Sequence, residues 1–187
     1  MIHAVMGANG AGKSTLMKVL AGSNPDYTGD VLYNGNVVEL RNPAAAKKLG
    51  IQIVYQEVDM ALIPTLTVAE NVMFNDLVMN MGHKQFVNYG KIRKDAKEAL
   101  ARLNVNIDVR RMCGTLTLAQ KQMVLIARAV QSACNFLILD EPTAPLSDTE
   151  TEELFRVVRH LRKTENLAVI FITHRIHEAV SYTHLRA

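Results

Sequence analysis

The sequence of 187 residues has no tryptophan, only two cysteines and few aromatic side chains, which make up 5% of its residues. Cys113 and Cys134 stand far apart, with no Cys-x-x-Cys pair and no histidine at metal-ligand spacing. This pattern argues against a disulfide framework and against a zinc site. No apolar run approaches the roughly 18 residues of a transmembrane helix, and no signal peptide opens the sequence. We therefore expect a soluble intracellular protein with an aliphatic core, which would act at a membrane only through a partner.

The sequence also lacks a strong net charge, repeats and an unusual composition. The net charge of +3 is too small to indicate nucleic-acid binding by itself. We find no internal repeat, heptad run or low-complexity stretch. Hydrophobic residues make up 49% and charged residues 21% of the sequence, as in ordinary globular proteins. The length suits one packed domain, or a domain with a subdomain.

The sequence does contain a complete phosphate-binding loop, and it matches the pattern G-x-x-x-x-G-K-[ST] at every fixed position. Its residues are Gly7, Ala8, Asn9, Gly10, Ala11, Gly12, Lys13, Ser14 and Thr15. Glycines allow backbone N–H groups to surround an anion, and the N-terminus of a following helix adds partial positive charge. We expect Lys13 to reach the β- and γ-phosphates and the Ser14 hydroxyl to bind Mg²⁺. The alternative is a glycine-rich turn before an ordinary helix, but the complete loop favours a nucleoside triphosphate site.

Strand and helix signals alternate along the chain. Residues 2–6 predict a short buried strand and residues 16–20 a helix, and Asn34-Gly35 predicts a hairpin within residues 30–40. Asn42-Pro43 predicts a short helix that stops at Gly50. Apolar runs predict further strands at 51–55, 136–139 and 167–173, and periodic patterns predict helices at 119–130 and 147–163.

The long middle of the chain differs from both ends. Thr67 and Glu70 form a capping box that opens a helix, and the sequence to about Arg111 is helical or irregular, with no clear strand. We therefore expect an α/β fold with a mainly parallel sheet and an inserted helical subdomain. The expected core comprises residues 1–66 and 128–180, and the subdomain comprises about 67–127.

Four residues at three predicted strand ends are candidates for chemistry. Asp140 and Glu141 follow a buried strand, at the edge where ligands of open α/β sheets bind. Asp140 could hold Mg²⁺ through water, and Glu141 could polarise the attacking water; a solvated acidic pair is the alternative. Gln56 could contact the metal or the water, although a lone glutamine at a strand end is usually a turn residue. His174 could donate to the γ-phosphate, although a lone histidine after a strand is more often a surface residue.

These motifs occur in an order that resembles the nucleotide-binding subunit of an ABC transporter, with a P-loop NTPase core. The resemblance runs from Ile2 to about Ala179 and includes 137–143 and Thr173-His174. Segments 63–72 and 116–124 are most similar to the ATPases of bacterial monosaccharide importers of the ribose, galactose and xylose type. Those ATPases fuse two cassettes in one chain, and this sequence resembles the first.

The resemblance implies roles for individual residues. Gln56 matches the glutamine that links the ATP site to the membrane subunits, Glu141 the catalytic glutamate and His174 the switch histidine. Ser14, Gln56 and Asp140 are the implied Mg²⁺ ligands. The family's signature motif, which closes over the γ-phosphate of a second cassette, corresponds to Leu116, Thr117, Leu118, Ala119 and Gln120.

The resemblance also implies a function and partners. It implies binding and hydrolysis of ATP, with Mg²⁺, to power the import of a simple sugar. The implied partners are a second cassette, fused or in trans, membrane permease subunits and, indirectly, a periplasmic sugar-binding protein, but no nucleic acid. The implied location is peripheral, at the cytoplasmic face of the bacterial inner membrane.

The sequence departs from the family pattern in three ways. Thr117 replaces the usual signature serine, and Leu118-Ala119 replace two glycines. Ser147 stands where the family has an aspartate, and we interpret Ser147 with Glu150 as a helix cap. We also expect a chain truncated at both ends, without the strands that carry an adenine-stacking aromatic residue and with a tail, 181–187, that does not resemble the family.

Two other functions remain as alternatives. One is a soluble ABC-type ATPase acting on ribosomes or DNA, which would use the basic residues of the insertion, although such residues are more often a solvated helix face. The DNA-repair members also carry a long coiled coil that this insertion lacks. The other alternative is an inactive nucleotide-binding fragment. The basic residues in question are Lys91, Arg93, Lys94, Lys97, Arg102, Arg110 and Arg111.

Overall fold

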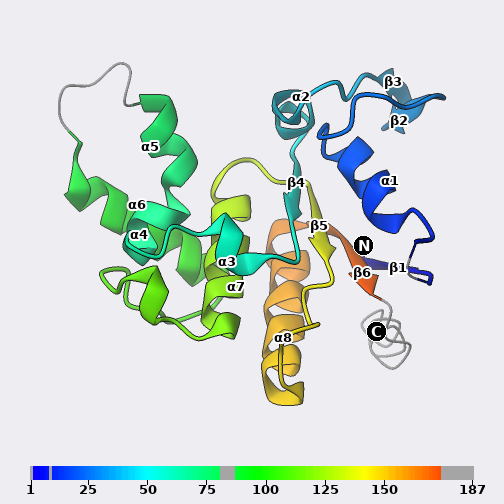
Figure 1. The fold of residues 1–187 in the computed structure, drawn as a ribbon. Helices are drawn as coiled ribbons and strands as arrows, with labels where there is room; N and C mark the ends of the chain where they lie inside the picture. Colours follow the sequence, from blue (N-terminus) through cyan, green and yellow to red (C-terminus); the bar gives the residue numbers. More distant parts are fainter. Residues whose placement is uncertain (1, 9, 81–86, 174–187) are drawn as a thin grey trace.

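The computed structural model describes residues 2–8, 10–80 and 87–173 (Figure 1). Four parallel strands form the main sheet in the order β1-β6-β5-β4. Their bounds are β1 Ile2–Met6, β4 Ile51–Val54, β5 Phe136–Asp140 and β6 Ala168–Thr173. The two inner strands, β5 and β6, are nearly continuous apolar runs, as expected for parallel strands that are covered on both faces.

Strand β1 differs from its prediction as a buried strand. It pairs with β6 along one side and forms one edge of the described sheet. Ile2 is buried, but Met6 is 44% exposed. The prediction was wrong about burial because a short apolar run does not reveal whether its strand has a neighbour on both sides.

The predicted helix after the loop, the hairpin and the second short helix are confirmed. Helix α1 (Lys13–Leu20) follows the loop, and strands β2 (Val31–Tyr33) and β3 (Asn36–Val38) form the hairpin. The turn residues Asn34 and Gly35 have φ angles of 51° and 81°, the left-handed conformation that a two-residue hairpin turn requires. Helix α2 (Pro43–Lys48) begins after Asn42, whose side chain accepts a hydrogen bond from the Ala45 N–H.

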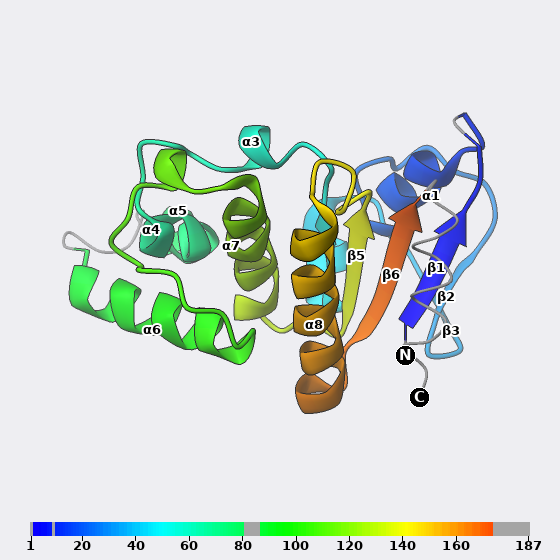
Figure 2. The same ribbon diagram turned by 90° about the horizontal axis from the view of Figure 1, so that it is seen from below.

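The remaining helices fall into two groups (Figures 1 and 2). Helix α8 (Asp148–Glu165) lies along the sheet, beside α7 (Leu118–Gln131). On the far side of α7 lie α4 (Val68–Val72), α5 (Phe74–Asn80) and α6 (Tyr89–Arg102). The short helix α3 (Val58–Ala61) and the 3-10 turn η1 (Cys113–Thr115) connect this helical group to the rest of the chain.

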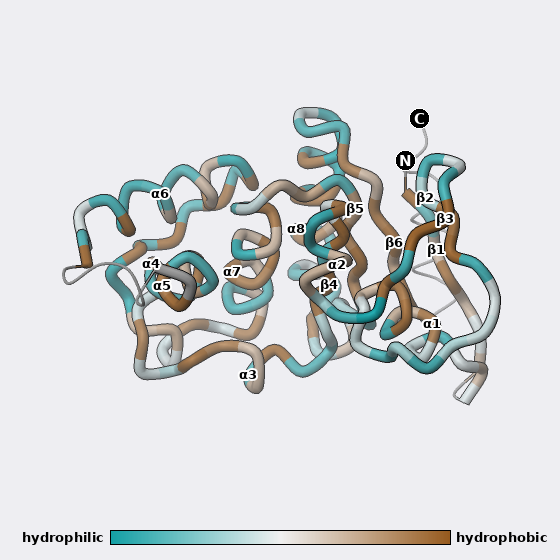
Figure 3. The backbone as a smooth tube through the Cα atoms, turned by 90° about the horizontal axis from the view of Figure 1, so that it is seen from above, coloured by the Kyte–Doolittle hydropathy of each residue, from teal (hydrophilic) through white to brown (hydrophobic). Residues whose placement is uncertain are grey.

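Two apolar clusters lie on opposite faces of the sheet. Leu137 and Leu139 of β5 belong to the larger cluster, with residues of α4, α6, α7 and α8. Ile138 points to the other face, because successive strand residues alternate, and packs with Met17 of α1 in the smaller cluster. Figure 3 shows the contrast between the apolar strands and the hydrophilic outer turns of α6.

The two cysteines are free thiols, as expected. Burial raises the pKa of Cys134 to about 12. Of the helices in the described ranges, none combines the length and the hydrophobicity that crossing a bilayer requires.

Candidate nucleotide-binding site

The parallel strands end at one edge of the sheet, and their register aligns the candidate residues there. Val54 of β4 pairs with Leu139 of β5, so Gln56 and Glu141 each lie two residues beyond one paired position. Asp140 pairs with Ile172 of β6, and the Glu141 N–H donates to the Ile172 carbonyl at 3.0 Å. Strand β1 also runs parallel to β6, so its carboxyl end, which leads directly into the phosphate loop, lies at the same end of the sheet. The fold therefore brings the loop, the acidic pair and Gln56 to the edge of an α/β sheet where ligands bind.

The phosphate loop has the backbone conformation that its glycines predict. Gly10 and Gly12 have φ angles of 81° and 82°, and a Cβ atom at either position would meet no atom within 4 Å. A Cβ at Gly7 would lie 3.3 Å from the Ala11 Cβ, tighter than an ordinary contact. Gly12 is the N-cap of α1 and has no side-chain cap. The N–H groups of the first turn of α1 therefore have no capping side chain, an arrangement suited to an anion. Asn9 lies outside the described residues.

Lys13 lies across the same loop. Its Nζ donates to the carbonyl oxygens of Gly7, at 2.7 Å, and Ala8, at 2.9 Å. The first turn of α1 contains no acidic side chain. The positive end of the helix and the ammonium group therefore have no neighbouring carboxylate in that turn, which favours binding of a phosphate.

Ser14 connects the loop to the acidic pair, because its hydroxyl is close enough to the Asp140 carboxylate to favour the charged form and lower its pKa. Asp140 is 9% exposed. Burial raises the pKa of Asp140 and the neighbouring Glu141 raises it further, while Ser14, Lys13 and Lys18 act in the opposite direction. A cation at this position would relieve that repulsion.

This donor set fits Mg²⁺. The described residues contain no group of three metal-binding acidic, histidine or cysteine side chains. Mg²⁺ does not need such a cage, because it is usually bound through one or two protein oxygens together with waters and substrate phosphates. The hydroxyl of Ser14 and the carboxylate of Asp140 supply oxygens of this kind.

Glu141 has an unusual backbone. Its φ angle of 45° lies in the left-handed region, which is uncommon for a residue with a side chain. The turn after it is closed by a 3.2 Å hydrogen bond from the Ala144 N–H to the Glu141 carbonyl. Strained conformations of this kind gather at functional sites, and here the turn directs the chain away from the sheet immediately after the acidic pair.

The other two strand-end candidates differ in what can be described. Gln56 is exposed, and its carbonyl accepts a 3.0 Å hydrogen bond from the Val58 N–H at the start of α3. The Gln56 side chain is therefore accessible at the edge of the sheet. His174 lies outside the described residues, although Thr173, which precedes it, ends β6 next to β1.

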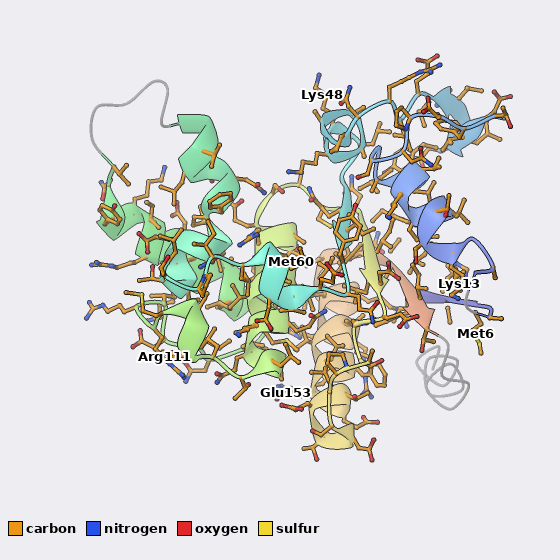
Figure 4. All side chains as sticks on the ribbon, in the orientation of Figure 1. Met6, Lys13, Lys48, Met60, Arg111 and Glu153 are labelled. Atoms are coloured by element: carbon orange, nitrogen blue, oxygen red, sulfur yellow. The ribbon has the colours of Figure 1, made fainter. Side chains whose placement is uncertain are left out.

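The structure does not bring the signature segment to the phosphate loop of the same chain. Helices α1 and α7 lie on opposite sides of β5 and α8 in both ribbon views (Figures 1 and 2). Lys13 and Arg111 mark the two sides in Figure 4. Any ligand held by Lys13 is therefore remote from Leu116–Gln120 of the same chain.

The signature segment is itself fixed by local hydrogen bonds. Thr117 is the N-cap of α7, and its Oγ1 accepts from the Gln120 N–H at 3.3 Å. In return, the Gln120 Oε1 accepts from the Thr117 N–H at 3.2 Å. Leu116 and Ala119 are buried, at 7% and 8% exposure, whereas Leu118 is half-buried. Thr117 is exposed, and accepting a hydrogen bond leaves its O–H able to donate.

The interpretation of Ser147 as a helix cap is confirmed. The Ser147 Oγ accepts from the Glu150 N–H at 3.4 Å, and the Glu150 carboxylate accepts from the Ser147 N–H at 3.0 Å. The Ser147 hydroxyl also donates to the Glu150 carboxylate at 2.9 Å, and this bond and the one from the Ser147 N–H lower the pKa of Glu150. Ser147 therefore has a structural role at the start of α8.

Sequence reasoning missed two polar residues inside the helical group. Asn71 is completely buried, and Arg128 is half-buried on α7. Their signal was weak: each is a polar residue within an otherwise apolar helical pattern. Their contacts, described below, link α7 to the segment that follows Gln56.

The comparisons with known proteins agree with this geometry. Residues 1–144 match the ABC transporter family. The chain belongs to this family. It is 41% identical over 179 residues to a protein of Burkholderia pseudomallei strain 1710b named ribose import ATP-binding protein RbsA 2, covering 95% of this chain and 34% of the relative. The chain therefore spans about a third of the length of the curated relatives it matches.

Solved structures give the same fold. The structure of cbiO1 from Clostridium perfringens, part of the ABC transporter complex cbiONQ, matches with a TM-score of 0.80 and 29% identity, covering 97% of this chain and 70% of that one. The dimeric structure of MJ0796, a bacterial ABC transporter cassette, matches with a TM-score of 0.74 and 25% identity, covering 96% and 77%. The expected α/β fold of the P-loop NTPase type is confirmed.

Proposed function

We propose that this chain binds ATP with Mg²⁺ and hydrolyses it as one cassette of an ABC transporter that imports a simple sugar. The observation that carries the proposal is the edge where the parallel strands end. There, an uncapped glycine loop with Lys13 lies next to the buried Asp140, and both Ser14 and Lys13 favour the charged form of that carboxylate. Membership of the ABC transporter family supports the same chemistry.

In this proposal, residues Gly7–Thr15 bind the phosphates, while Ser14, Asp140 and Gln56 hold Mg²⁺. The ion would neutralise charge on the phosphate oxygens. Glu141 polarises the attacking water from its turn after β5. We propose that His174 donates a hydrogen bond to the γ-phosphate, and this role rests on the sequence resemblance alone.

A complete catalytic site requires a second cassette, because the signature residues Leu116–Gln120 are remote from the loop of their own chain. The dimeric state of the MJ0796 cassette supports pairing. The partner is fused or in trans, and it brings its Thr117-equivalent hydroxyl to the phosphate held by Lys13. Charge stabilisation by donors from both cassettes then arises only after closure.

The division of the chain follows from these roles. Residues 1–66 and 128–180 form the nucleotide-binding core, and about 67–127 form the helical subdomain that carries the signature. Relatives named ribose import ATP-binding proteins support a simple sugar as the transported molecule. We accordingly propose permease subunits and, indirectly, a periplasmic sugar-binding protein as partners, at the cytoplasmic face of the inner membrane.

Release of phosphate from ATP by the purified chain, with and without Mg²⁺, tests the catalytic assignment. Glu141→Gln should lower turnover by about 100-fold or more while ATP still binds, because it removes a positioned base. Glu152→Gln is the matched control: Glu152 is an exposed glutamate of α8 that pairs with Arg159, and its substitution should leave turnover unchanged. Equal turnover of the parent and Glu141→Gln would contradict the role of Glu141.

Import is tested separately, in cells. Uptake of radiolabelled ribose should depend on the gene that encodes this chain, and Glu141→Gln in that gene should abolish uptake. Normal ribose uptake with hydrolysis abolished would contradict the sugar-import assignment while leaving the ATPase assignment intact.

A further inference from the structure

Arg128 donates hydrogen bonds to carbonyl groups at the C-terminal ends of two short helices, α3 and α4. Its Nη1 donates to the carbonyl of Ala61, the last residue of α3, at 2.7 Å, and its Nε donates to the carbonyl of Asn71, in the last turn of α4, at 2.6 Å. Carbonyl groups at helix C-termini lack partners within their own helix and carry partial negative charge. The guanidinium group also lies over the Phe74 ring, 5.6 Å from its centroid.

No ion pair of the described residues includes Arg128. Burial lowers the pKa of Arg128. A half-buried cation with neutral acceptors is a poor source of stability. Its geometric role, fixing two backbone segments with one rigid fork, is the more direct physical reason for an arginine here.

Asn71 holds the other side of this contact. Its Oδ1 accepts from the Arg128 Nη2 at 3.0 Å and from the Ile63 N–H at 2.9 Å. Its Nδ2 donates to the carbonyls of Ile63, Leu66 and Thr67. Asn71 therefore fixes the chain between α3 and α4 and connects it to Arg128.

A second contact joins the same two elements. The Lys121 Nζ lies 2.7 Å from the Asp59 carboxylate of α3. Lys121 and Arg128 are seven residues apart, so they lie on one face of α7. Helix α7 is thus attached to segment 59–72, which begins three residues after Gln56, at two points along its length.

Arg128 also lies at the boundary between α7 and the sheet. Together with Ala61, Leu125 and Ala129, it lines a cavity of about 390 Å³ whose lining includes the β4 residues Ile51–Val54. The contact of Arg128 with segment 59–72 therefore lies directly beside the interface between α7 and the sheet.

We propose that Asn71 and Arg128 are positioning residues that make segment 59–72 and helix α7 a single unit. The two residues thereby fix Thr117–Gln120, at the start of α7, relative to the chain that follows Gln56. The proposal rests on the proposed function, since it gives Thr117–Gln120 a role at the ATP of a second cassette.

The turnover test compares two arginine-to-lysine substitutions. Arg128→Lys keeps the charge but cannot contact both helix ends as a planar fork. The matched control is Arg102→Lys, because Arg102 also donates to a backbone carbonyl of α7, that of Val130, but pairs with Glu165 of α8 instead of segment 59–72. At saturating ATP, kcat of Arg128→Lys should fall by about 10-fold or more, with the Kd of ATP unchanged within about twofold.

Arg102→Lys should keep the parental kcat even if its thermal stability falls as much as that of Arg128→Lys. Asp59→Asn, at a side chain that is 71% exposed and so does not threaten folding, should lower kcat by about twofold at constant ATP affinity. Parental kcat in Arg128→Lys, or an equal loss of kcat in both lysine variants, would overturn the proposal.

Hydrogen exchange tests the single unit without any need for ATP hydrolysis. In the parent chain, the amides of α3, α4 and the first half of α7 should open together, with one dependence on added urea. In Arg128→Lys, segment 59–72 should exchange at least about 10-fold faster while α7 retains its protection. If segment 59–72 and α7 open separately in the parent chain, they are not a single unit, whatever the outcome of the ATPase assay.

Discussion

The phosphate loop and the signature segment each lead into a helix, but the two helix N-termini are held in opposite ways. Gly12 caps α1 with a left-handed backbone and no side-chain cap. Thr117 caps α7 through a reciprocal pair of hydrogen bonds with Gln120. The difference indicates that α1 keeps its first-turn N–H groups for a ligand, whereas α7 satisfies them itself and presents its exposed Thr117 hydroxyl.

Substitution of Lys13 in the phosphate loop should have the largest effect on ATP binding. Lys13→Ala is expected to weaken ATP binding by about 100-fold, because a charge-assisted contact to phosphate is lost. The free energy of unfolding should change by less than about 0.5 kcal/mol, since the hydrogen bonds of Lys13 are to two backbone carbonyls of a largely exposed loop. Titration calorimetry and urea unfolding measure the two quantities. Lys18→Ala, at the exposed lysine of the same helix, is the control and should bind ATP within a few-fold of the parent.

The signature cap can be compared with a structural cap in the same chain. Thr117→Ala and Ser147→Ala each remove the N-cap of a capping box, and each should cost about 1 kcal/mol of stability. Only Thr117→Ala should also lower turnover, by about 10-fold, because its hydroxyl serves the second cassette. Equal turnover in the two variants, measured at matched stability, would remove the functional distinction between the caps.

The buried carboxylate of Asp140, beside the phosphate loop, should lower the stability of the folded chain. Because burial raises the pKa of Asp140, the folded chain binds this proton more tightly than the unfolded chain, and this group makes stability fall as pH rises through the folded pKa. Asp140→Asn should therefore raise the urea midpoint at neutral pH and remove that slope, while Mg²⁺-dependent ATP hydrolysis is lost. A lower midpoint at neutral pH would contradict the cost assigned to the buried carboxylate.

The smallest effect is expected at the far end of α8. The side-chain hydrogen bond from Arg102 lowers the pKa of Glu165, so its contribution is present above the unfolded pKa and is lost as pH falls through the folded pKa. Glu165→Gln should cost less than about 1 kcal/mol at neutral pH, because the pair is partly exposed. The difference from the parent should vanish in acid, and ATP turnover should not change.

Much of the fold was predictable because its signals are local. The turn at Asn34-Gly35 and the capping residues Thr67 and Ser147 each determine the backbone within a few residues. The edge that gathers Gln56 and Asp140 was predictable because parallel strands end together.

The rest depends on contacts between distant parts of the chain. The exposure of β1 is set by its place at the edge of the described sheet, which its own five residues do not reveal. The contact of Asn71 with Arg128 joins positions 57 residues apart, and no local pattern pairs them. The roles assigned to individual site residues, including His174, remain predictions.

A mixing experiment tests most directly whether the loop and the signature segment serve one site from two cassettes. Lys13→Ala has an intact signature segment, and a chain with Thr117→Ala and Gln120→Ala has an intact loop, so each should be inactive alone. If they pair at random, half of the dimers contain one intact site, and the mixture should recover up to about a quarter of the parental ATPase activity. Under conditions where light scattering shows the chain to be dimeric, activity no greater than the sum of the two variants would contradict a site shared between cassettes.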